Sequence, residues 1–195
     1  MRLIERRRKT ENLSTVSGFK EIYDQYAPKF IGLCYRYCGN TEDAEDVMHD
    51  GFLNIIRNLD KFQYRGEGSL EAWMKKIMVN TVLKFIQRSS KYNKLLVFDI
   101  SEGERNLPDE PETNSYPEVS REYLLKLITE LPLGYRMVFN FYVMENYSHK
   151  EIAGLLHCTE NTSRSQLSKA RNWLQKRILE SGKHNEYEQK TASYR

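Results

Sequence analysis

Residues 147–178 have the sequence YSHKEIAGLLHCTENTSRSQLSKARNWLQKRI, which decides the fold of this chain. Apolar residues recur there at helical spacing in two runs, which are Ile152, Ala153, Leu155 and Leu156, and then Leu167, Ala170, Leu174 and Ile178. Only His157, Cys158 and Thr159 separate the two helices that these runs predict, and Thr159 suits the start of the second one. Two helices joined by so short a turn, the second one basic, predict a helix-turn-helix.

The second of these helices has a polar side that suits duplex DNA. If Leu167, Ala170 and Leu174 face inward, the outer and flanking positions are Thr162, Arg164, Ser165, Gln166, Lys169 and Arg171. Arginine and glutamine make bidentate contacts to guanine and adenine in the major groove, worth about 1–3 kcal/mol each. Ser148 and Lys150, at the start of the preceding helix, suit phosphate contacts that set the register. The alternative is an ordinary helical hairpin with a solvated basic face.

The amino-terminal half is also helical by its apolar spacing. A stripe over residues 19–38 predicts one helix, kinked at Pro28. Asn40 or Thr41 is expected to cap a second, with its apolar stripe at Ala44, Val47, Met48, Phe52, Ile55 and Leu59. After a loop with two glycines, Ser69 is expected to cap a third helix that runs to about Arg88.

The sequence therefore predicts an all-α protein of two small helical domains joined by a flexible acidic linker, the second a helix-turn-helix domain of four helices. The expected segments are a basic arm (1–18), a first domain (19–94), the linker (95–117), a second domain (118–182) and a disordered tail (183–195). The acidic stretch of residues 99–122, which forms most of this linker, holds three of the five prolines and few apolar residues, a composition that resists regular structure.

Charge is segregated along the chain, although the net charge is only +3. Residues 41–50 hold five acids and no Lys or Arg, and residues 57–94 hold nine bases against three acids. Residues 99–122 hold eight acids against two bases, and residues 148–183 hold seven bases against three acids. Basic modules attract polyanions and an acidic tether avoids them, so this alternation favours a nucleic-acid-binding protein.

Composition excludes other classes. No run of about 18 apolar residues is present, so no membrane insertion is expected. The basic start has no apolar stretch after it and does not look like a secretory signal. Three cysteines are too few for a disulfide scaffold, and Cys34 and Cys38, one turn apart on an apolar stripe, are expected to be buried. These features predict a cytoplasmic location.

The basic block of residues 57–94 interleaves aromatic residues with lysine and arginine. Stacking platforms in a basic groove hold single-stranded nucleic acid, at about 1–3 kcal/mol per stacked base. Asn80 adds an amide for a base edge. The alternative is that Trp73 and Phe85 belong to the core.

No catalytic or metal site is expected. Adjacent acids in residues 42–50 point in different directions on a helix and do not converge on one ion. The four histidines are scattered, and His157 beside Cys158 supplies two ligands where structural zinc needs four. No phosphate-binding glycine loop or nucleophile motif is present, so we predict no cofactor and no enzyme activity.

Three segments in this order resemble the signatures of bacterial RNA polymerase sigma factors of the small extracytoplasmic-function (ECF) subfamily. They are DAEDVMHDGFLNIIRNLDKF (43–62), LEAWMKKIMVNTVLKFIQR (70–88) and residues 147–178. The resemblance covers residues 19–179 and implies a promoter-specificity factor. Such a factor recruits core RNA polymerase, recognises two promoter elements and opens the DNA to initiate transcription.

The resemblance also implies roles for particular residues. Contacts to the clamp helices of the polymerase's largest subunit are expected from Asp43, Asp46, Asp50, Phe52 and Leu53. Capture of the melted downstream promoter strand is expected from Tyr64, Gly66, Ser69, Lys76, Asn80, Lys84 and Arg88. The upstream element would be read as duplex DNA by the helix-turn-helix residues named above. An anti-sigma factor is a further expected partner.

The chain departs from the family pattern at a few positions. His49 stands where glutamine is usual. Two residues later comes Gly51, and glycine within a helix costs about 1 kcal/mol relative to alanine. Ser163 stands where a β-branched apolar residue is common, and Gln166 where arginine is common. These changes affect the expected base preference. The rival hypotheses are an operator-binding regulator, a hydrolase that uses the acids of residues 42–50, and an interaction module that binds polymerase without opening DNA.

Overall fold

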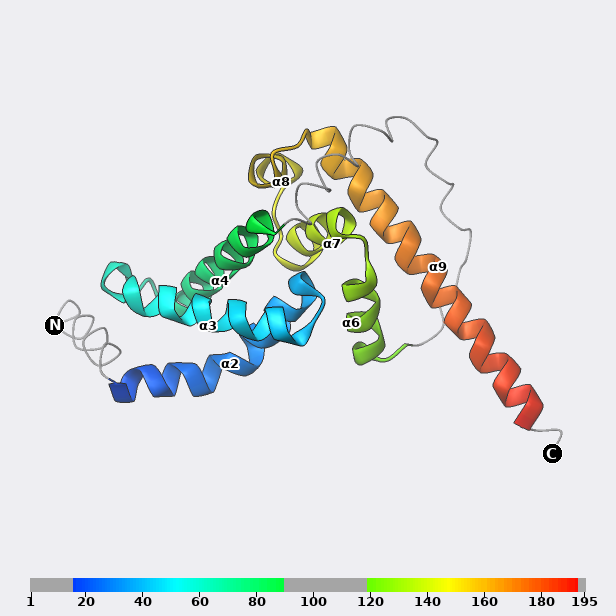
Figure 1. The fold of residues 1–195 in the computed structure, drawn as a ribbon, viewed down its shortest axis with the longest axis horizontal. Helices are drawn as coiled ribbons and strands as arrows, with labels where there is room; N and C mark the ends of the chain where they lie inside the picture. Colours follow the sequence, from blue (N-terminus) through cyan, green and yellow to red (C-terminus); the bar gives the residue numbers. More distant parts are fainter. Residues whose placement is uncertain (1–15, 90–118, 193–195) are drawn as a thin grey trace. The chain divides into compact units, whose positions relative to one another are not determined.

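The computed structural model describes residues 16–89 and 119–192, and for residues 16, 17 and 182–192 it describes only the backbone. Every regular element in these ranges is helical, which confirms the all-α prediction. The chain divides into two compact units, 1–92 and 93–195, shown in Figure 1. The predicted linker (95–117) and most of the predicted basic arm (1–18) lie outside the described residues.

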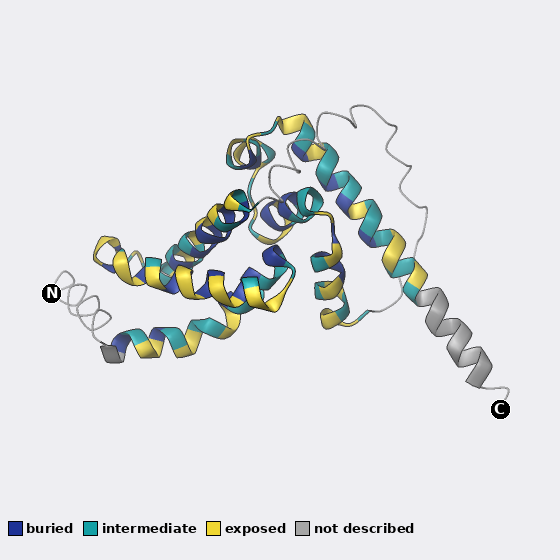
Figure 2. Cartoon of the chain, viewed as in Figure 1, coloured by how far each residue is buried: buried dark blue, intermediate teal, exposed yellow. Residues whose placement is uncertain are grey.

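Unit 1 is built from α2 (Val16–Cys38), α3 (Thr41–Arg57), a short 3-10 turn η1 (Leu59–Lys61) and α4 (Ser69–Arg88). The helix α2 continues through Pro28, and its ribbon changes direction part-way along in Figure 1, as expected of a proline inside a helix. Figure 2 shows the buried residues on the sides of α2, α3 and α4 that face one another. All six members of the stripe predicted on α3 and η1 are buried, as are Cys34 and Cys38.

Two caps illustrate how local sequence places these helices. Asn40 is the N-cap of α3: its Oδ1 accepts the backbone N–H of Asp43 at 2.8 Å. The predicted cap of α4 is wrong by one residue, because Gly68 occupies the N-cap position with a positive φ of 76°. Ser69 is instead the first helical residue, and its hydroxyl donates to the carbonyl of Gly66 at 2.6 Å. Glycine suits this position because a left-handed backbone is nearly free of strain only without a Cβ.

Unit 2 contains α6 (Arg121–Glu130), α7 (Leu133–Phe139), a π-helical turn η2 (Asn140–Met144), α8 (His149–Leu156) and α9 (Glu160–Ala192). Part of its core joins α6 and α9 through Leu127, Leu131, Ala170 and Leu174, with Trp173 packed against them. The four predicted helices are all present. The sequence does not predict the widened turn η2, where the buried Asn140 side chain donates to the carbonyl of Arg136 at 2.9 Å.

The last helix is longer than expected. We place its end near Gly182 from the sequence, whereas α9 runs to Ala192 and takes in much of the predicted disordered tail (183–195). The added segment contains Lys, Glu, Gln and Ala and no proline, and these residues favour a helix once one has started. Residues 193–195 lie outside the described residues.

Candidate polymerase and nucleic-acid interfaces

One face of α3 combines acids with exposed apolar side chains. Asp46 and Asp50 are exposed and one turn apart, and Leu53 lies three residues further with 47% of its surface exposed. Ile56, at 42% exposure, lies on the flank of the same face. The sequence analysis missed Ile56, although it lies outside the apolar stripe of α3 and so could have been recognised as a surface residue. Exposed aliphatic residues beside charges are typical of a protein-binding surface.

Two of the five residues expected at this face have other roles. Phe52 is 2% exposed and packs among Tyr23 and Phe30, with ring centroids 4.6 and 5.8 Å away. Its side chain belongs to the core of unit 1, so its assignment as a direct polymerase contact is wrong. Asp43 lies in the first turn of α3, where its carboxylate accepts the Asn40 amide at 2.7 Å. This bond helps to fix the start of the helix.

On α4, four residues expected to hold the downstream strand form an exposed stripe. Lys76, Asn80, Lys84 and Arg88 follow one another at four-residue spacing, and all four are exposed. Three positive charges with one amide between them suit a phosphate backbone and a base edge. Trp73 is half-buried, and its ring packs on that of the buried Phe62 with the centroids 5.3 Å apart. This agrees with the alternative that Trp73 belongs to the core.

The loop before α4 holds the other three residues expected at the single strand. Tyr64 is half-buried, and Gly66 has a φ of 122°, which favours glycine. The Ser69 hydroxyl is already engaged by the Gly66 carbonyl and by the backbone N–H of Arg65, at 2.6 and 3.2 Å. Ser69 therefore shapes the loop in this structure.

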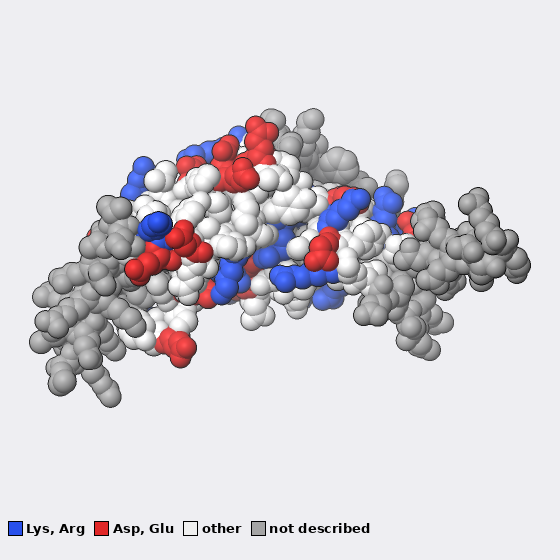
Figure 3. Space-filling view, turned by 90° about the horizontal axis from the view of Figure 1, so that it is seen from below, with Lys and Arg blue, Asp and Glu red and all other residues white. Residues whose placement is uncertain are grey.

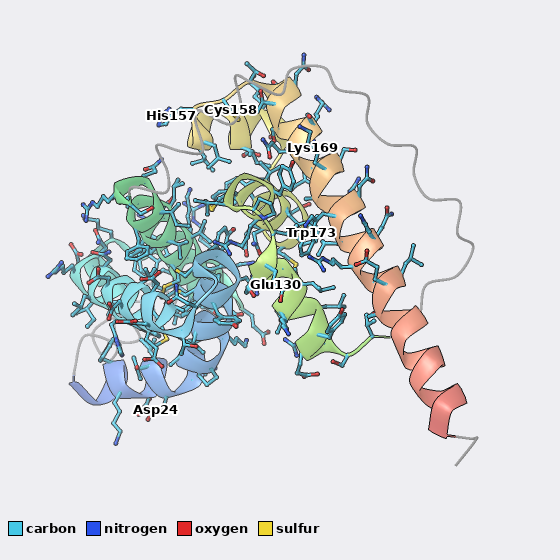
Figure 4. All side chains as sticks on the ribbon, turned by 45° about the vertical axis from the view of Figure 1, so that its right-hand side comes forward. Asp24, Glu130, His157, Cys158, Lys169 and Trp173 are labelled. Atoms are coloured by element: carbon cyan, nitrogen blue, oxygen red, sulfur yellow. The ribbon has the colours of Figure 1, made fainter. Side chains whose placement is uncertain are left out.

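The helix-turn-helix of unit 2 has the predicted geometry. Its first helix, α8, begins at a capping box in which Ser148 and Glu151 exchange hydrogen bonds through side chain and backbone. The pKa of Glu151 is lowered by the hydrogen bond from the Ser148 hydroxyl and by that from its backbone N–H. His157 turns the chain with a φ of 54°, and Thr159 caps α9 by accepting the N–H of Thr162 at 3.0 Å. Figure 4 shows His157 and Cys158 at the turn, with Lys169 further along α9.

The outer side of α9 carries most of the predicted duplex-reading residues. Arg164 and Arg171 are exposed, and Ser165 and Lys169 are half-buried. Asn161 and Ser168 lie on the same side, one turn from Arg164, and the sequence analysis missed both although the spacing from Arg164 identifies them. Lys150 is exposed on α8, and Ser148 is exposed with its hydroxyl engaged by Glu151 at 2.7 Å.

Two of the residues predicted to contact duplex DNA, Gln166 and Thr162, are less available for that contact. Gln166 is half-buried beside the inner face of α9, and its Oε1 is buried without a hydrogen-bond partner among the described residues. Thr162 is half-buried, and its hydroxyl lies 2.9 Å from that of Thr159. Both lie at the edge of the outer side of α9.

The inner side of α9 is joined to α8 by a polar contact. Ser163 is fully buried, and its Oγ lies 2.9 Å from Nδ1 of His149. The His149 ring also stacks on Tyr142 of η2, with centroids 4.5 Å apart. Burial lowers the pKa of His149, and Arg164 and Arg171 lower it further, while Glu160 opposes them.

The described surface carries both signs of charge. On the face drawn in Figure 3, acidic and basic side chains form small groups with uncharged surface between them. Within the described ranges, no three His, Cys, Asp or Glu side chains are grouped so that they could hold a metal ion. No helix among the described residues has the length and apolarity needed to cross a bilayer.

Comparison with known proteins identifies the two units. The family model of sigma-70 region 2 matches residues 22–92, and that of sigma-70 region 4 matches residues 121–174. The chain is 26% identical over 183 residues to the ECF RNA polymerase sigma-E factor of Escherichia coli, covering 90% of this chain and 92% of that protein. The chain belongs to the sigma-70 family, in its ECF group.

This sigma factor is also similar to a second curated sigma factor and to one of known structure. The ECF sigma-E factor of Haemophilus influenzae is 25% identical over 169 residues, covering 83% of this chain and 87% of that protein. A solved structure of the sigma factor RpoE with the anti-sigma factor NepR from Bartonella quintana is similar with a TM-score of 0.48. It has 20% identity and covers 83% of this chain and 96% of the solved one. The two sigma-70 family models and the ECF relatives make the present chain a promoter-recognition factor for transcription initiation.

Proposed function

We propose that this sigma factor docks on core RNA polymerase through α3, with Asp46, Asp50 and Leu53 as the central contacts and Ile56 beside them. The observation that carries the proposal is the exposure of Leu53 and Ile56 on a helix whose other large apolar residues are buried. Burial of two aliphatic side chains against a partner is worth about 1.5–3 kcal/mol for each. The two carboxylates would favour basic groups on the clamp helices of the largest subunit.

We further propose that unit 1 captures the downstream promoter strand after melting. The stripe of Lys76, Asn80, Lys84 and Arg88 supplies backbone and base contacts, and Tyr64 with Gly66 forms the loop at which a base is unstacked. Extracting a base costs a few kcal/mol, which the contacts of the pocket must offset. The exposure of all four stripe residues supports this assignment.

Unit 2 reads the upstream element as duplex DNA. In this proposal Arg164, Ser165, Lys169 and Arg171 face the major groove from α9, and Thr162 and Gln166 act at its edge. Ser148 and Lys150 contact phosphates and set the register. The exposed cationic side of α9 supports the assignment.

Each unit is expected to bind DNA weakly alone. Polymerase links the two units, so the second contact becomes intramolecular and the combined affinity exceeds that of either one. Because it acts on polymerase and promoter DNA, we place the protein in the cytoplasm, without enzymatic activity of its own. An anti-sigma factor that covers the docking face is the further partner that family membership implies.

The decisive experiment measures the affinity of the purified full chain for core RNA polymerase without DNA. We expect one-to-one binding with a Kd below about 1 μM, weakened at least about tenfold by Asp46→Arg. Asp24→Arg is the matched control, since Asp24 is an exposed acid of the same unit on α2 (Figure 4) and should leave the affinity unchanged. Absence of binding at tens of micromolar would favour the operator-binding regulator instead.

A further inference from the structure

The reading helix begins with an acid that is paired to one of its arginines. Glu160 is the first residue of α9, and its Oε2 lies 3.3 Å from Nη2 of Arg164, one turn further on. The two side chains are 46% and 61% exposed, so the pair lies on the surface of the helix-turn-helix. Glu160 lies three residues before the buried Ser163 and Arg164 directly after it, so the pair lies where the buried side of α9 meets its exposed side.

The electrostatics at His149 place these charges in one group. Arg164 and Arg171 both lower the pKa of His149, whereas Glu160 raises it. The negative charge of Glu160 therefore acts in the same place as the positive charges of Arg164 and Arg171. A carboxylate at a DNA-binding surface repels phosphates of every sequence alike, so Glu160 weakens binding that is independent of sequence.

The pairing also limits what the Arg164 side chain does. An arginine presents five donors in a rigid planar fork. When a carboxylate holds one edge of that fork, the remaining donors keep a fixed direction and can meet O6 and N7 of a guanine together. An unpaired arginine on the same helix would also reach phosphate oxygens, which carry no sequence information.

We propose that Glu160 is a positioning residue that holds the Arg164 guanidinium for a guanine of the upstream element and so increases base specificity. The inference rests on the proposed role of the outer face of α9 in reading duplex DNA. Glu160 increases specificity in two ways. It orients the Arg164 guanidinium toward the base, and its negative charge disfavours contacts to the phosphates of the DNA backbone.

The test uses the full chain assembled with core RNA polymerase and selects bound molecules from promoter duplexes with a randomised upstream element. In Glu160→Gln, which keeps the length of the side chain, we expect the preference for guanine at one position to fall at least about threefold. Affinity for a duplex of unrelated sequence is expected to rise at least about twofold. A purely structural role would lower both quantities together.

Two further variants sharpen the comparison. Glu180→Gln removes the same charge from the same helix, where Glu180 pairs with Arg177 at 3.8 Å, and it should change neither quantity. Glu160→Asp keeps the charge but shortens the reach, so it should leave the affinity for unrelated DNA low while reducing the guanine preference. This variant separates repulsion from orientation and remains informative if Glu160→Gln folds poorly.

Arg164→Ala is measured in parallel to separate the positioning role of Glu160 from the proposed DNA reading by Arg164. It should abolish the same guanine preference. If Arg164→Ala leaves every base preference unchanged, the proposed reading face is wrong and the role of Glu160 is overturned with it. If Arg164→Ala removes a preference that Glu160→Gln and Glu160→Asp both retain, the positioning role alone is overturned and unit 2 still reads DNA through Arg164.

Discussion

The side chain of Met78 on α4 fills the space in which a Cβ on Gly51 of α3 would lie. A Cβ built on Gly51 would come within 2.5 Å of Met78 Cε, and still closer to its Sδ. Both residues are buried, Met78 completely. Glycine within a helix costs about 1 kcal/mol relative to alanine. The sequence shows only that cost, whereas the structure shows the close packing of α4 on α3 that the glycine permits.

Gly51→Ala is therefore expected to destabilise unit 1 by about 1 kcal/mol. Overpacking a core costs about 1–3 kcal/mol, and the gain in helix propensity offsets part of it. The measurement is urea unfolding of the full chain followed by the fluorescence of Trp73 in a Trp173→Phe background, so that only unit 1 reports. Gly32→Ala is the control, because nothing lies within 4 Å of its Cβ position, and it should stabilise the same unit. Equal changes in the two variants would contradict the packing argument.

Asn80→Ala is expected to impair strand opening more than polymerase binding. Asn80 is exposed in the centre of the α4 stripe, and loss of one base contact is worth about 1–3 kcal/mol, or roughly tenfold in the open-complex equilibrium. Permanganate reactivity of unpaired thymines measures the opening, and the affinity for core polymerase, measured on the same sample, is the control. Equal loss of both would count against a role in strand capture.

The stability of unit 2 should decrease in mild acid because of His149. Burial, together with Arg164 and Arg171, holds the pKa of His149 below its ordinary value of 6.5 in the folded chain. The unfolded chain therefore binds a proton more readily, and the stabilisation present above pH 6.5 is progressively lost as the pH falls below it. Urea unfolding followed by Trp173 in a Trp73→Phe background, from pH 7.5 to 5, measures this loss.

His149→Gln is the reference for that pH series, since glutamine keeps a hydrogen-bonding group and does not titrate. Its unfolding free energy should fall less between pH 7.5 and 5 than that of the wild type. If the two proteins lose stability in parallel, the proton uptake belongs to another group.

The three cysteines should differ in reactivity. Burial, with the nearby Cys38, raises the pKa of Cys34 to about 12, and Cys34 and Cys38 are both buried in unit 1. Cys158, in the turn of the helix-turn-helix, is only partly buried. A maleimide at pH 7.5 should label Cys158 at least about a hundredfold faster than the other two, because the thiolate is the reactive form and access is needed. Cys158→Ser should abolish the fast phase, and its persistence would contradict the assignment.

Apolar spacing predicts the helices well because each helix buries one stripe. On α3 the stripe from Ala44 to Ile55 is buried as expected, and Thr159 caps α9 as predicted. The same periodicity places Phe52 in the core, and only the family resemblance suggested a surface role for it. Ile56 lies outside the stripe and is exposed, so the pattern contained a signal for it that the analysis did not use.

Other features leave no mark in the apolar spacing. The π-helical turn η2 has no periodic signature, and apolar spacing does not reveal that the buried Asn140 side chain donates to the carbonyl of Arg136 one turn earlier. The start of α4 depends on the left-handed backbone of its N-cap Gly68, and the hydroxyl of Ser69, the first helical residue, donates back to the Gly66 carbonyl. The partial burial of Gln166 likewise depends on how α9 packs, which its own sequence does not specify.

The hydrogen bond between Ser163 and His149 has a consequence for the rotation of α9 about its axis. Contacts between aliphatic side chains are non-directional, so a helix held only by them can turn or slip at modest cost. A hydrogen bond weakens steeply when its angle changes, and here it joins a fully buried serine to a histidine on the neighbouring helix. Turning α9 by one residue would break it and leave the serine buried without that partner. The rotational setting of the side of α9 proposed to meet DNA is therefore fixed by a hydrogen bond on its buried side.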